Sequence, residues 1–478
     1  MNLLQKLFGT GTTKAVKEAE LPVENSLKTD YNKTRQVSAQ RSGCFAPSVN
    51  MIFSEDGTIK VCCHNRENLL GNYPEKSIHE LWHGEDAVLF RQKMKEFSFL
   101  SGCWVCTNDY NRGSFAEMPS RHFDSLPQHH TYPTMMEFLL KNTCNLECVM
   151  CSGELSSSIR TNREKLPLQK SPYGPEFLEQ IQEFIPYLKE TRFSSSGEAF
   201  LIDTNFKLWE MLIERNPECL IVVQTNGTIM NGRVKDYLNR GNFKIGVSLD
   251  SLQKEVFEAI RVNASFERVM ENIQFFAQYS KERNKPLNIS TCVMRQNWSE
   301  LPDFVNFCNR IEAVATFHKV MTPLPYALHN LPAEELQHIY DELSNHQFTA
   351  NTRLEKLNKA QYEYFLSVIA SWIENAGKRN EEPEDLRHLN TTELNAKFKS
   401  SLRTYILQGD MLEKDREGLY KQCESKIDYI IQNLEKDQQK KEWLLLMNSI
   451  PVPSIFPAIK NLGTEKLYEL SVLRVEQY

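Results

Sequence analysis

Hydrophobic and polar positions between residues 130 and 322 alternate between short apolar runs and longer amphipathic stretches. The apolar runs are typical of strands and lie at Thr134–Leu140, Glu190–Ser195, Leu220–Gln224, Lys244–Leu249, Leu287–Met294 and Ala313–Met321. The amphipathic stretches are typical of helices and lie at Glu176–Leu188, Thr204–Glu214, Gly232–Arg240, Phe266–Lys281 and Ser299–Ile311. Six strand-like runs alternating with helices predict an α/β fold, an open, partial (β/α)6 TIM-like barrel with a parallel sheet. In such a barrel, functional side chains are expected at the carboxyl ends of the strands.

Residues 43–125 follow a different pattern, which predicts a small cysteine-rich domain. Val49–Phe53 and Thr58–Cys63 are typical of strands, and Glu55–Gly57 between them is typical of a hairpin turn. Helices are predicted at Ser77–Trp82 and at Ala87–Phe97. Residues 1–42 are polar and lack periodicity, so a disordered tail or linker is expected there.

Residues 323–478 predict an α-helical C-terminal region. Apolar residues recur at helical spacing in three stretches, Leu336–Leu343, Leu357–Ile373 and Ile427–Leu434. A charged loop is expected at Lys378–Asp385, and Pro451–Pro457 is a proline-rich piece. No catalytic motif is present in this region, which leaves a cap, a partner surface or a dimer contact open.

Composition restricts the functional classes. The chain has 478 residues and a formal net charge of −6, so no long-range field for nucleic acid is implied. No run of about 18 apolar residues predicts a membrane span, and the N-terminus does not have the pattern of a signal peptide. Twelve cysteines without a signal peptide indicate reduced thiols and metal ligation. A cytoplasmic protein is therefore expected.

Cys144, Cys148 and Cys151 follow the first predicted barrel strand at C-x3-C-x2-C spacing. A loop with three thiolates can hold one iron–sulfur cluster. A structural zinc ion or a closed cluster uses four protein ligands, so three cysteines leave one metal position for a ligand that is not protein. Chance occurrence or zinc binding remains open for these three residues alone.

This spacing resembles the radical S-adenosylmethionine (radical SAM) superfamily. The resemblance implies that Cys144, Cys148 and Cys151 hold a catalytic [4Fe-4S] cluster whose fourth iron is chelated by SAM. It also implies reductive cleavage of SAM to a 5'-deoxyadenosyl radical that abstracts hydrogen from a substrate. The cofactors would supply this chemistry, and the protein would supply position and exclusion of water.

Motifs at the predicted strand ends fit the same resemblance. Gly197 and Glu198 are similar to the family's Gly-Gly-Glu motif, which binds the SAM amino group, although Ser196 replaces the first glycine. Asn226 lies in a Thr-Asn-Gly sequence that matches a SAM-pocket motif. An ordinary turn remains an alternative for each motif.

Four further residues are assigned to the SAM pocket by resemblance. Ser248 and Asp250 follow the fourth strand and would bind the ribose or the methionine end, although a helix N-cap at Asp250 is equally open. Arg261 would lie near the SAM carboxylate or on the surface. Met150 would pack on adenine or belong to the core.

A second set of cysteines lies in residues 43–125, and Cys103-Trp-Val-Cys106 forms a C-x2-C knuckle. With cysteines on the hairpin, this is a metal-site layout, and a structural zinc ribbon is one alternative. The segment resembles the SPASM and twitch auxiliary-cluster domains of radical SAM enzymes, although it precedes the barrel here. The resemblance implies one auxiliary iron–sulfur cluster, expected to be [4Fe-4S], with Cys44, Cys62, Cys103 and Cys106 as ligands. Cys63 competes with Cys62, because neighbouring strand residues point to opposite faces.

The sequence therefore predicts a radical SAM enzyme that modifies a peptide or protein. A sugar or other small metabolite is the alternative substrate class, and a non-catalytic electron-transfer or regulatory iron–sulfur protein is the alternative function. A flavodoxin or ferredoxin is the expected electron donor. Neither nucleic acid nor a membrane span is expected, and the sequence does not give the oligomeric state.

Overall fold

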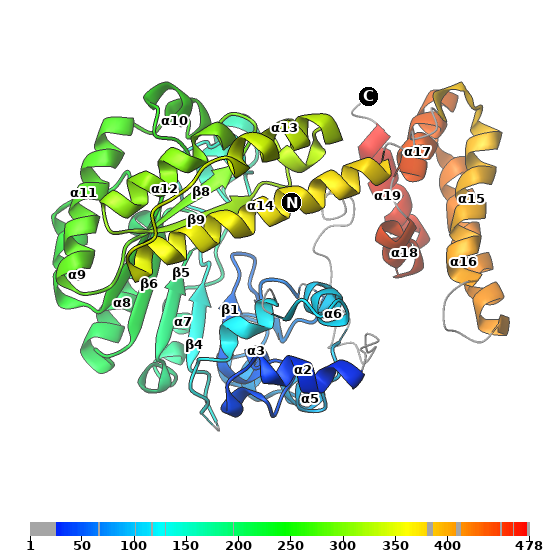
Figure 1. The fold of residues 1–478 in the computed structure, drawn as a ribbon. Coiled ribbons are helices and arrows are strands. Elements are labelled where there is room, and N and C mark those ends of the chain that lie inside the picture. The colour runs from blue at the N-terminus through cyan, green and yellow to red at the C-terminus, as the bar shows by residue number, and fades with distance from the viewer. Residues whose placement is uncertain are drawn as a thin grey trace. The chain divides into compact units, whose positions relative to one another are not determined.

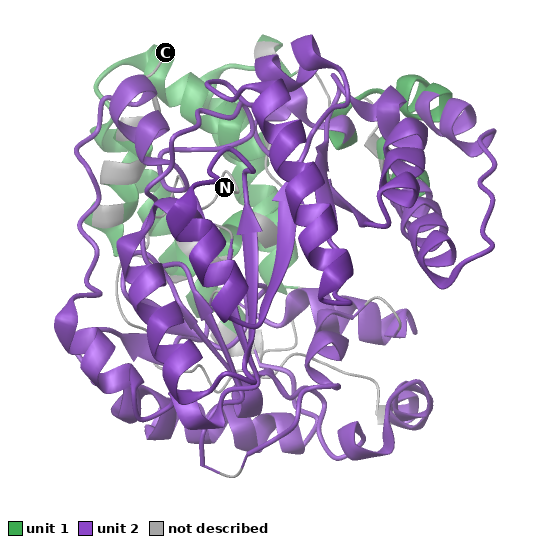
Figure 2. Cartoon of the chain, turned by 90° about the vertical axis from the view of Figure 1, so that its left-hand side faces the viewer, with its two compact units in different colours: residues 1–12, 329–338, 369–478 green, residues 13–328, 339–368 purple. Residues whose placement is uncertain are grey.

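The computed structural model describes residues 25–379, apart from positions 66, 101, 116–117, 130 and 195, and residues 386–407, 413–449, 452–461 and 463–475. The chain divides into two compact units (Figure 2). The larger unit comprises residues 13–328 and 339–368. The smaller unit comprises residues 1–12, 329–338 and 369–478. Each is described by itself below.

The larger unit contains the predicted parallel sheet. The six predicted strands of this sheet are β4 (Met135–Phe138), β5 (Glu190–Phe193), β6 (Leu220–Thr225), β7 (Phe243–Ser248), β8 (Asn288–Val293) and β9 (Val314–Lys319). Each pairs in parallel with the next along the chain, so the strand order follows the sequence. The partial (β/α)6 architecture is therefore confirmed, and all six predicted strands are present to within a few residues.

Helices connect these strands and cover one face of the sheet, as the green part of Figure 1 shows. They are α7 (Pro175–Ile181), α8 (Asp203–Arg215), α9 (Gly232–Arg240), α10 (Lys254–Ile260), α11 (Phe266–Glu282) and α12 (Leu301–Arg310). Trp209 of α8 is fully buried and packs edge-on against Phe193 of β5 and Phe243 of β7. Apolar residues of alternate strand positions thus face the helices, which leaves the other positions, many of them polar, on the opposite face.

The cysteine-rich segment is part of the same sheet. Strand β1 (Asn50–Phe53) pairs in parallel with β4, and β2 (Thr58–Lys60) and β3 (Gly71–Asn72) continue the sheet in antiparallel fashion. The result is one nine-stranded sheet in the order β3-β2-β1-β4-β5-β6-β7-β8-β9. The predicted hairpin is present, but it is not a separate sheet, because β1 pairs with β4 and so joins the hairpin to the sheet of the barrel.

Short helices surround that hairpin. They are α3 (Ala46–Val49), α4 (Ile78–His83), α5 (Glu85–Lys95) and α6 (Trp104–Asn111). Helix α4 begins at a capping box, in which Ser77 accepts from the Glu80 backbone and Glu80 accepts from the Ser77 backbone. Helix α6 was not predicted, and it carries Cys106 in its first turn.

The described part of residues 1–42 corrects the tail prediction, because residues 25–42 pack on the cysteine-rich segment. Helix α2 (Lys28–Lys33) buries Tyr31 completely, and its hydroxyl contacts Ser120 Oγ at 2.9 Å. Arg35 and Asp124 form a buried ion pair, with Nη2 and Oδ1 2.6 Å apart. One aromatic and one paired arginine anchor a polar stretch, which a periodicity search does not detect. Residues 1–24 of that prediction lie outside the described residues.

Two helices follow β9, α13 (Ala333–Ser344) and α14 (Arg353–Arg379). Near its start, α14 carries Asn358, which is fully buried against edge strand β9. Asn358 Oδ1 accepts from the Ala315 backbone N–H at 2.8 Å, and Nδ2 donates to the Ala313 carbonyl at 2.9 Å. This asparagine therefore satisfies backbone groups that no further strand pairs.

The smaller unit is helical, as predicted for the C-terminal region, and it has its own core. Its helices include α15 (Thr391–Leu407), α16 (Glu413–Asn433), α17 (Asp437–Ser449), α18 (Val452–Asn461) and α19 (Thr464–Val475). Leu394, Leu402, Cys423 and Ile427 are fully buried in one cluster contributed by these helices. Helix α18 contains most of the proline-rich stretch Pro451–Pro457. Most of the charged loop expected at Lys378–Asp385 lies outside the described residues.

Candidate functional site

The loop that carries Cys144, Cys148 and Cys151 begins directly after β4 and is fixed by hydrogen bonds. The Cys144 N–H donates to Ser157 Oγ at 3.1 Å, and the Ser158 hydroxyl donates to the Cys144 carbonyl at 2.8 Å. The backbone N–H of Val149 donates to the carbonyl of Ile260, at the end of α10, at 3.0 Å. The loop is therefore held from two sides.

The three thiols are largely shielded from solvent. Burial raises the pKa of Cys144 above its ordinary value. Cys148 and Cys151 hydrogen-bond to each other, and this bond, followed by burial, raises the pKa of Cys148. Backbone and side-chain N–H groups point at the sulfur of Cys144, from Leu146 at 3.5 Å and from Asn226 Nδ2 at 3.9 Å. Such donors stabilise the thiolate form that ligates iron.

Gly197 joins the Glu198 motif to the cysteine loop. Its φ is +67°, and an added Cβ would lie 2.7 Å from the carbonyl oxygens of both Lys141 and Thr143. The N–H of Glu198 donates to that Thr143 carbonyl at 2.7 Å. A side chain at position 197 would meet backbone, and so the close approach of the two loops requires glycine.

The Glu198 carboxylate is buried, with 1% of the residue exposed, and is held by three hydrogen bonds. Oε1 accepts from the Thr225 hydroxyl at 2.6 Å and from the Phe200 N–H at 3.2 Å. Oε2 accepts from the Asn226 N–H at 2.7 Å. Burial raises the pKa of Glu198, although these bonds oppose the shift. Oε2 keeps acceptor capacity for a cationic group.

Asn226 is both a turn residue and a contact of the cysteine loop. Its Oδ1 accepts from the Thr228 N–H at 2.9 Å, and Gly227 follows with a φ of +75°. Its Nδ2 donates to Asn145 Oδ1 at 3.0 Å, within the cysteine loop. The turn interpretation of the Thr-Asn-Gly motif is therefore confirmed, and the same side chain also contacts the cysteine loop.

Ser248 belongs to a polar row on the face of the sheet opposite the helices. Gln224 of β6 donates from Nε2 to Ser248 Oγ on β7 at 2.8 Å and to Ser290 Oγ on β8 at 2.9 Å. An added Cβ at Gly246 would lie 2.2 Å from Gln224 Oε1, so this glycine makes room for the row. Ser248 is thus already engaged by protein.

Asp250 and Arg261 pair with each other. Arg261 Nε lies 2.7 Å from Asp250 Oδ2, and both side chains are buried. Asp250 Oδ1 accepts from the Cys292 N–H at 2.7 Å. Arg261 Nη1 lies 4.0 Å from Cys148 Sγ. Burial lowers the pKa of Arg261, but Asp250 and Cys148 outweigh it, and so the guanidinium stays charged.

The structure also excludes the two alternatives left open for these residues, a helix N-cap at Asp250 and a surface position for Arg261. Helix α10 has Gln253 as its N-cap, so Asp250 does not cap it. Arg261 is 7% exposed and is not a surface residue. Asp250 therefore orients the arginine toward the cysteine loop, a role that the sequence did not indicate.

Met150 is half-buried beside a small apolar cluster formed by Ile260, Met294 and Val320. Cys292 packs against the same cluster, and burial followed by the charge of Asp250 raises the pKa of Cys292 to about 12. These side chains come from the cysteine loop, from the end of α10 and from the carboxyl ends of strands. An apolar surface of this kind can contact an aromatic ring.

Sequence reasoning missed several residues that support the site. Glu300 is buried and accepts from the Ser251 hydroxyl at 2.8 Å and from the Leu252 N–H at 2.7 Å, which fixes the loop after β7. Gln224 and Asn145 were also missed. Gln224 could have been found from strand alternation, because it is a polar residue at the end of an apolar strand, and alternate residues of a strand point to opposite faces of the sheet. Glu300 carries no such signal.

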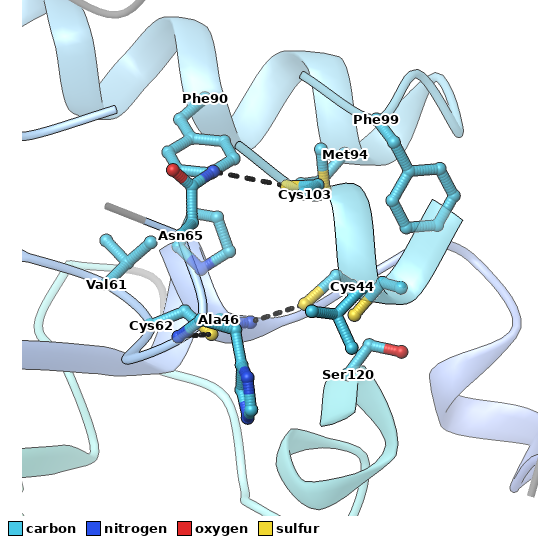
Figure 3. Close-up of a pocket in the computed structure, with 14 residues that line it drawn as sticks. Cys44, Ala46, Val61, Cys62, Asn65, Phe90, Met94, Phe99, Cys103 and Ser120 are labelled. Carbon is cyan, nitrogen blue, oxygen red and sulfur yellow. Dashed lines mark hydrogen bonds between the residues drawn. The ribbon is translucent and has the colours of Figure 1, made fainter. Parts of the chain in front are cut away.

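A second candidate site is a cavity in the cysteine-rich segment, with about 410 Å³ of empty space including its opening to solvent (Figure 3). All four predicted auxiliary ligands line it, namely Cys44, Cys62, Cys103 and Cys106. Cys63 does not line the cavity and is exposed. The remaining lining is mostly apolar, with Val61, Phe90, Met94 and Phe99 among it.

Hydrogen-bond donors point at these sulfurs. The Ala46 N–H donates to Cys44 Sγ at 3.4 Å, and the His64 N–H donates to Cys62 Sγ at 3.4 Å. Burial raises the pKa of Cys103 to about 11 and that of Cys106 to about 12. The thiols are therefore neutral at physiological pH until a metal deprotonates them.

The cysteine sets fit iron–sulfur clusters. Within the described ranges, no three His, Cys, Asp or Glu side chains converge on the position of a single metal ion. The four thiols of the second site instead surround a cavity, which suits a group of several irons better than one zinc ion. The Ser196 hydroxyl, beside Glu198, is buried and has no hydrogen-bond partner among the described residues, so a polar group is left for a ligand.

Comparison with known proteins identifies both parts. A family model described as the radical SAM superfamily matches residues 139–308. This chain carries a radical SAM domain. A second model, SPASM, described as an iron–sulfur cluster-binding domain, matches residues 44–107. The resemblance predicted from the cysteine spacing is therefore confirmed, and its cofactors are SAM and iron–sulfur clusters.

The radical SAM domain is similar to parts of several curated proteins. FeMo cofactor biosynthesis protein NifB of Methanocaldococcus infernus is 21% identical over 171 residues, which are 35% of this chain and 51% of that protein. GTP 3',8-cyclase 1 of Mycobacterium tuberculosis is 34% identical over 102 residues, 21% of this chain and 28% of that protein. A cysteine-type anaerobic sulfatase-maturating enzyme of Clostridium novyi is 29% identical over 159 residues, 30% of this chain and 40% of that protein. The chain spans about half or less of each relative.

Solved structures overlap with the chain to a limited extent. Native anSMEcpe with bound AdoMet aligns at 19% identity and a TM-score of 0.33, over 49% of this chain and 62% of that one. Streptococcus suis SuiB bound to precursor peptide SuiA aligns at 14% identity and a TM-score of 0.32, over 50% of each chain.

In the part of this chain that the structure describes, no helix is long and apolar enough to cross a bilayer.

Proposed function

We propose that this protein is a radical SAM enzyme with one auxiliary iron–sulfur cluster. Cys144, Cys148 and Cys151 hold the catalytic cluster. The observation that carries the proposal is the joining of the three-cysteine loop to a buried carboxylate, because Gly197 packs on the loop backbone and Glu198 follows it directly. An electron-transfer protein has no need of such a carboxylate beside its cluster.

When bound, the cluster supplies one electron for the reductive cleavage of SAM to methionine and a 5'-deoxyadenosyl radical. The protein's contribution is position. Glu198, held by Thr225 and Asn226, presents Oε2 to the amino group of SAM. Ser196, two residues before it in the sequence, has a buried hydroxyl without a hydrogen-bond partner among the described residues. Because the carboxylate is already oriented, it loses little freedom on binding.

Two further groups complete the SAM pocket. Arg261, oriented by Asp250, places a positive charge near Cys148 and toward the SAM carboxylate. Met150 and the apolar cluster around Ile260 offer a surface for adenine and exclude water from it. Gln224 keeps Ser248 in place at the neighbouring strand end, where the ribose would lie.

The auxiliary cluster passes electrons in this proposal. Cys44, Cys62, Cys103 and Cys106 surround one cavity, which provides a thiolate for each iron of a [4Fe-4S] cluster. No iron is then left for a substrate. A small one-electron carrier, such as a flavodoxin or ferredoxin of the cytoplasm, is the donor that we propose.

The first test is SAM cleavage. Protein purified without oxygen and reconstituted with iron and sulfide would be given dithionite and SAM, and 5'-deoxyadenosine would be measured. We expect about eight irons in the wild type and about four in the triple variant Cys144→Ala, Cys148→Ala, Cys151→Ala, which forms no deoxyadenosine. Iron without SAM cleavage, even with cell extract present, would favour the electron-transfer class. Zinc in place of iron would refute the proposal.

The substrate class that we propose is a peptide or protein. A sulfatase-maturating enzyme is among the relatives, but so is a GTP cyclase, and so a small metabolite remains the second candidate. The test is whether cell extract accelerates deoxyadenosine formation, and whether protease treatment of the extract abolishes that effect. Loss after protease supports a peptide or protein. Stimulation by the protease-treated extract, or by its small-molecule filtrate, supports the second candidate.

A further inference from the structure

Asn65 lies at the wall of the auxiliary cavity with its amide directed at a cluster ligand. It follows β2 in a loop, is 2% exposed, and lines the cavity together with the four thiols. Its Nδ2 donates to Cys103 Sγ at 3.2 Å, the bond drawn in Figure 3. This donor belongs to a side chain and is therefore open to substitution.

The orientation of the Asn65 amide is fixed by its other end. Oδ1 accepts from the N–H of Glu67 at 3.1 Å and from the N–H of Asn68 at 3.0 Å. Because the carbonyl oxygen is held by two backbone donors, the NH2 group must face Cys103. The assignment of oxygen and nitrogen is therefore set by the surrounding hydrogen bonds.

Gly102 allows Asn65 to approach Cys103 this closely. It precedes the cysteine, has a φ of +90°, and an added Cβ would lie 2.4 Å from Asn65 Oδ1. Two separate loops thus have local conformations that bring one buried amide to one sulfur. A purely structural asparagine would need only its backbone contacts, which Oδ1 already makes.

We propose that Asn65 is a positioning residue that raises the reduction potential of the auxiliary cluster. The inference rests on the proposed cluster at Cys44, Cys62, Cys103 and Cys106. One-electron reduction adds a negative charge that spreads over the sulfurs, and a hydrogen bond to a ligating sulfur stabilises the reduced form more than the oxidised form. Without the amide donor, reduction becomes less favourable.

The test is a redox titration of the full-length chain in the triple variant Cys144→Ala, Cys148→Ala, Cys151→Ala, which retains only the auxiliary ligands. Asn65→Ser keeps a hydroxyl for the loop N–H groups but is too short to reach Cys103, and it adds no charge. We expect the equilibrium constant for one-electron reduction to fall about tenfold, which is a midpoint about 59 mV more negative. The reduced cluster would be followed by electron paramagnetic resonance.

The matched control is Trp104→Phe. Trp104 Nε1 donates to Glu67 Oε1 at 3.0 Å, so the substitution removes a hydrogen bond between the same two loops without touching a sulfur. The midpoint potential of the cluster in Trp104→Phe should equal that in the triple cysteine variant without this substitution. If Asn65→Ser binds the cluster but its midpoint potential is unchanged, the role proposed for Asn65 is overturned and the auxiliary site is not. No iron in the triple variant would overturn the auxiliary site as well.

A second measurement needs no substitution at Asn65, and so it does not depend on whether Asn65→Ser folds. The triple variant would be labelled with asparagine carrying nitrogen-15 in its side chain, and the reduced cluster would be examined by pulsed electron paramagnetic resonance. We expect a weak coupling to one side-chain nitrogen, from Asn65, since the variant lacks the cluster near Asn226. Absence of any such coupling would overturn the proposal.

Discussion

At the scale of single residues, Gly197 shows how closely the Gly197-Glu198 motif and the cysteine loop depend on each other. Its backbone lies in the left-handed region, and backbone oxygens of the cysteine loop occupy the space of a Cβ. No rotamer change can relieve such contacts, because all the atoms involved belong to the main chain.

Gly197→Ala should therefore weaken both the fold and the cluster site. We expect a loss of about 1–3 kcal/mol in unfolding free energy from the strained backbone, and reduced iron content at the catalytic site. Thermal denaturation and iron analysis would measure the two effects. Gly232→Ala is the control, since that glycine begins α9 with open space around it and alanine favours a helix. Equal behaviour of the two variants would contradict the expectation.

The raised thiol pKa values predict how the auxiliary cluster responds to pH. Loss of the cluster returns protons to thiols whose pKa values in the folded protein are about 11 for Cys103 and about 12 for Cys106. Protonation is thus favoured throughout the accessible range, and more so as pH falls. Absorbance of the triple cysteine variant near 400 nm should decay faster at pH 6 than at pH 8. A pH-independent or opposite trend would argue against thiolate ligands.

How much of the site was visible in the sequence depends on how local each signal is. Cys144, Cys148 and Cys151 were visible because their short spacing lies on one loop, and Gly197-Glu198 because its two residues are adjacent. Gln224, Glu300 and Asn65 act across strands or loops that only the fold brings together. The partner of Asp250 was hidden for the same reason.

At the scale of elements, Asn358 pairs backbone groups that the edge strand of an open sheet leaves unpaired. Strand β9 is at one end of the strand order, and α14 supplies an amide that bonds the Ala315 N–H and the Ala313 carbonyl. A third bond, from Nδ2 to Asn309 Oδ1 at 2.8 Å, fixes the amide against α12. One side chain thus replaces part of a missing strand.

Asn358→Leu should be strongly destabilising, because it leaves buried backbone groups without partners. We expect a loss of about 2–4 kcal/mol, the cost of two unsatisfied groups. The measurement is the urea midpoint at unchanged m-value. Lys359→Leu, the next residue on α14, loses only a partly exposed ion pair with Glu363 and should change stability by less than about 0.5 kcal/mol. Similar losses in both variants would show that the amide bonds add nothing.

Elements with a clear period were predicted well, and the others were not. The six strands from β4 to β9 were found, because short apolar runs that alternate with amphipathic helices have a strong signal. Helices α6 and α10 were missed because both are short. Helix α2 depends on Tyr31 alone, which no pattern search would select.

At the scale of the whole molecule, the two units have separate cores. The apolar cluster of the smaller unit is formed by residues between Leu394 and Leu467, and that of the larger unit by residues between Tyr31 and Ala315. Stability within each cluster therefore comes from contacts that the other does not share.

A fragment of residues 386–478 should fold by itself. We expect helical circular dichroism and a cooperative thermal transition, because the five helices bury a common core. Phe398→Ser, at a residue that is 1% exposed in that core, should abolish cooperativity, with a loss of about 3–5 kcal/mol or more. A non-cooperative wild-type fragment would mean that the cluster depends on the rest of the chain.

The pairing of β1 with β4 has a consequence for synthesis on the ribosome. Every thiol of the auxiliary cavity, from Cys44 to Cys106, leaves the exit tunnel before β4 and the catalytic cysteines do. Until Met135–Phe138 emerges, the edge of β1 that pairs with β4 in the finished sheet has no partner. The order of the chain therefore places the thiols of the auxiliary cavity outside the ribosome before the strand that joins their hairpin to the barrel.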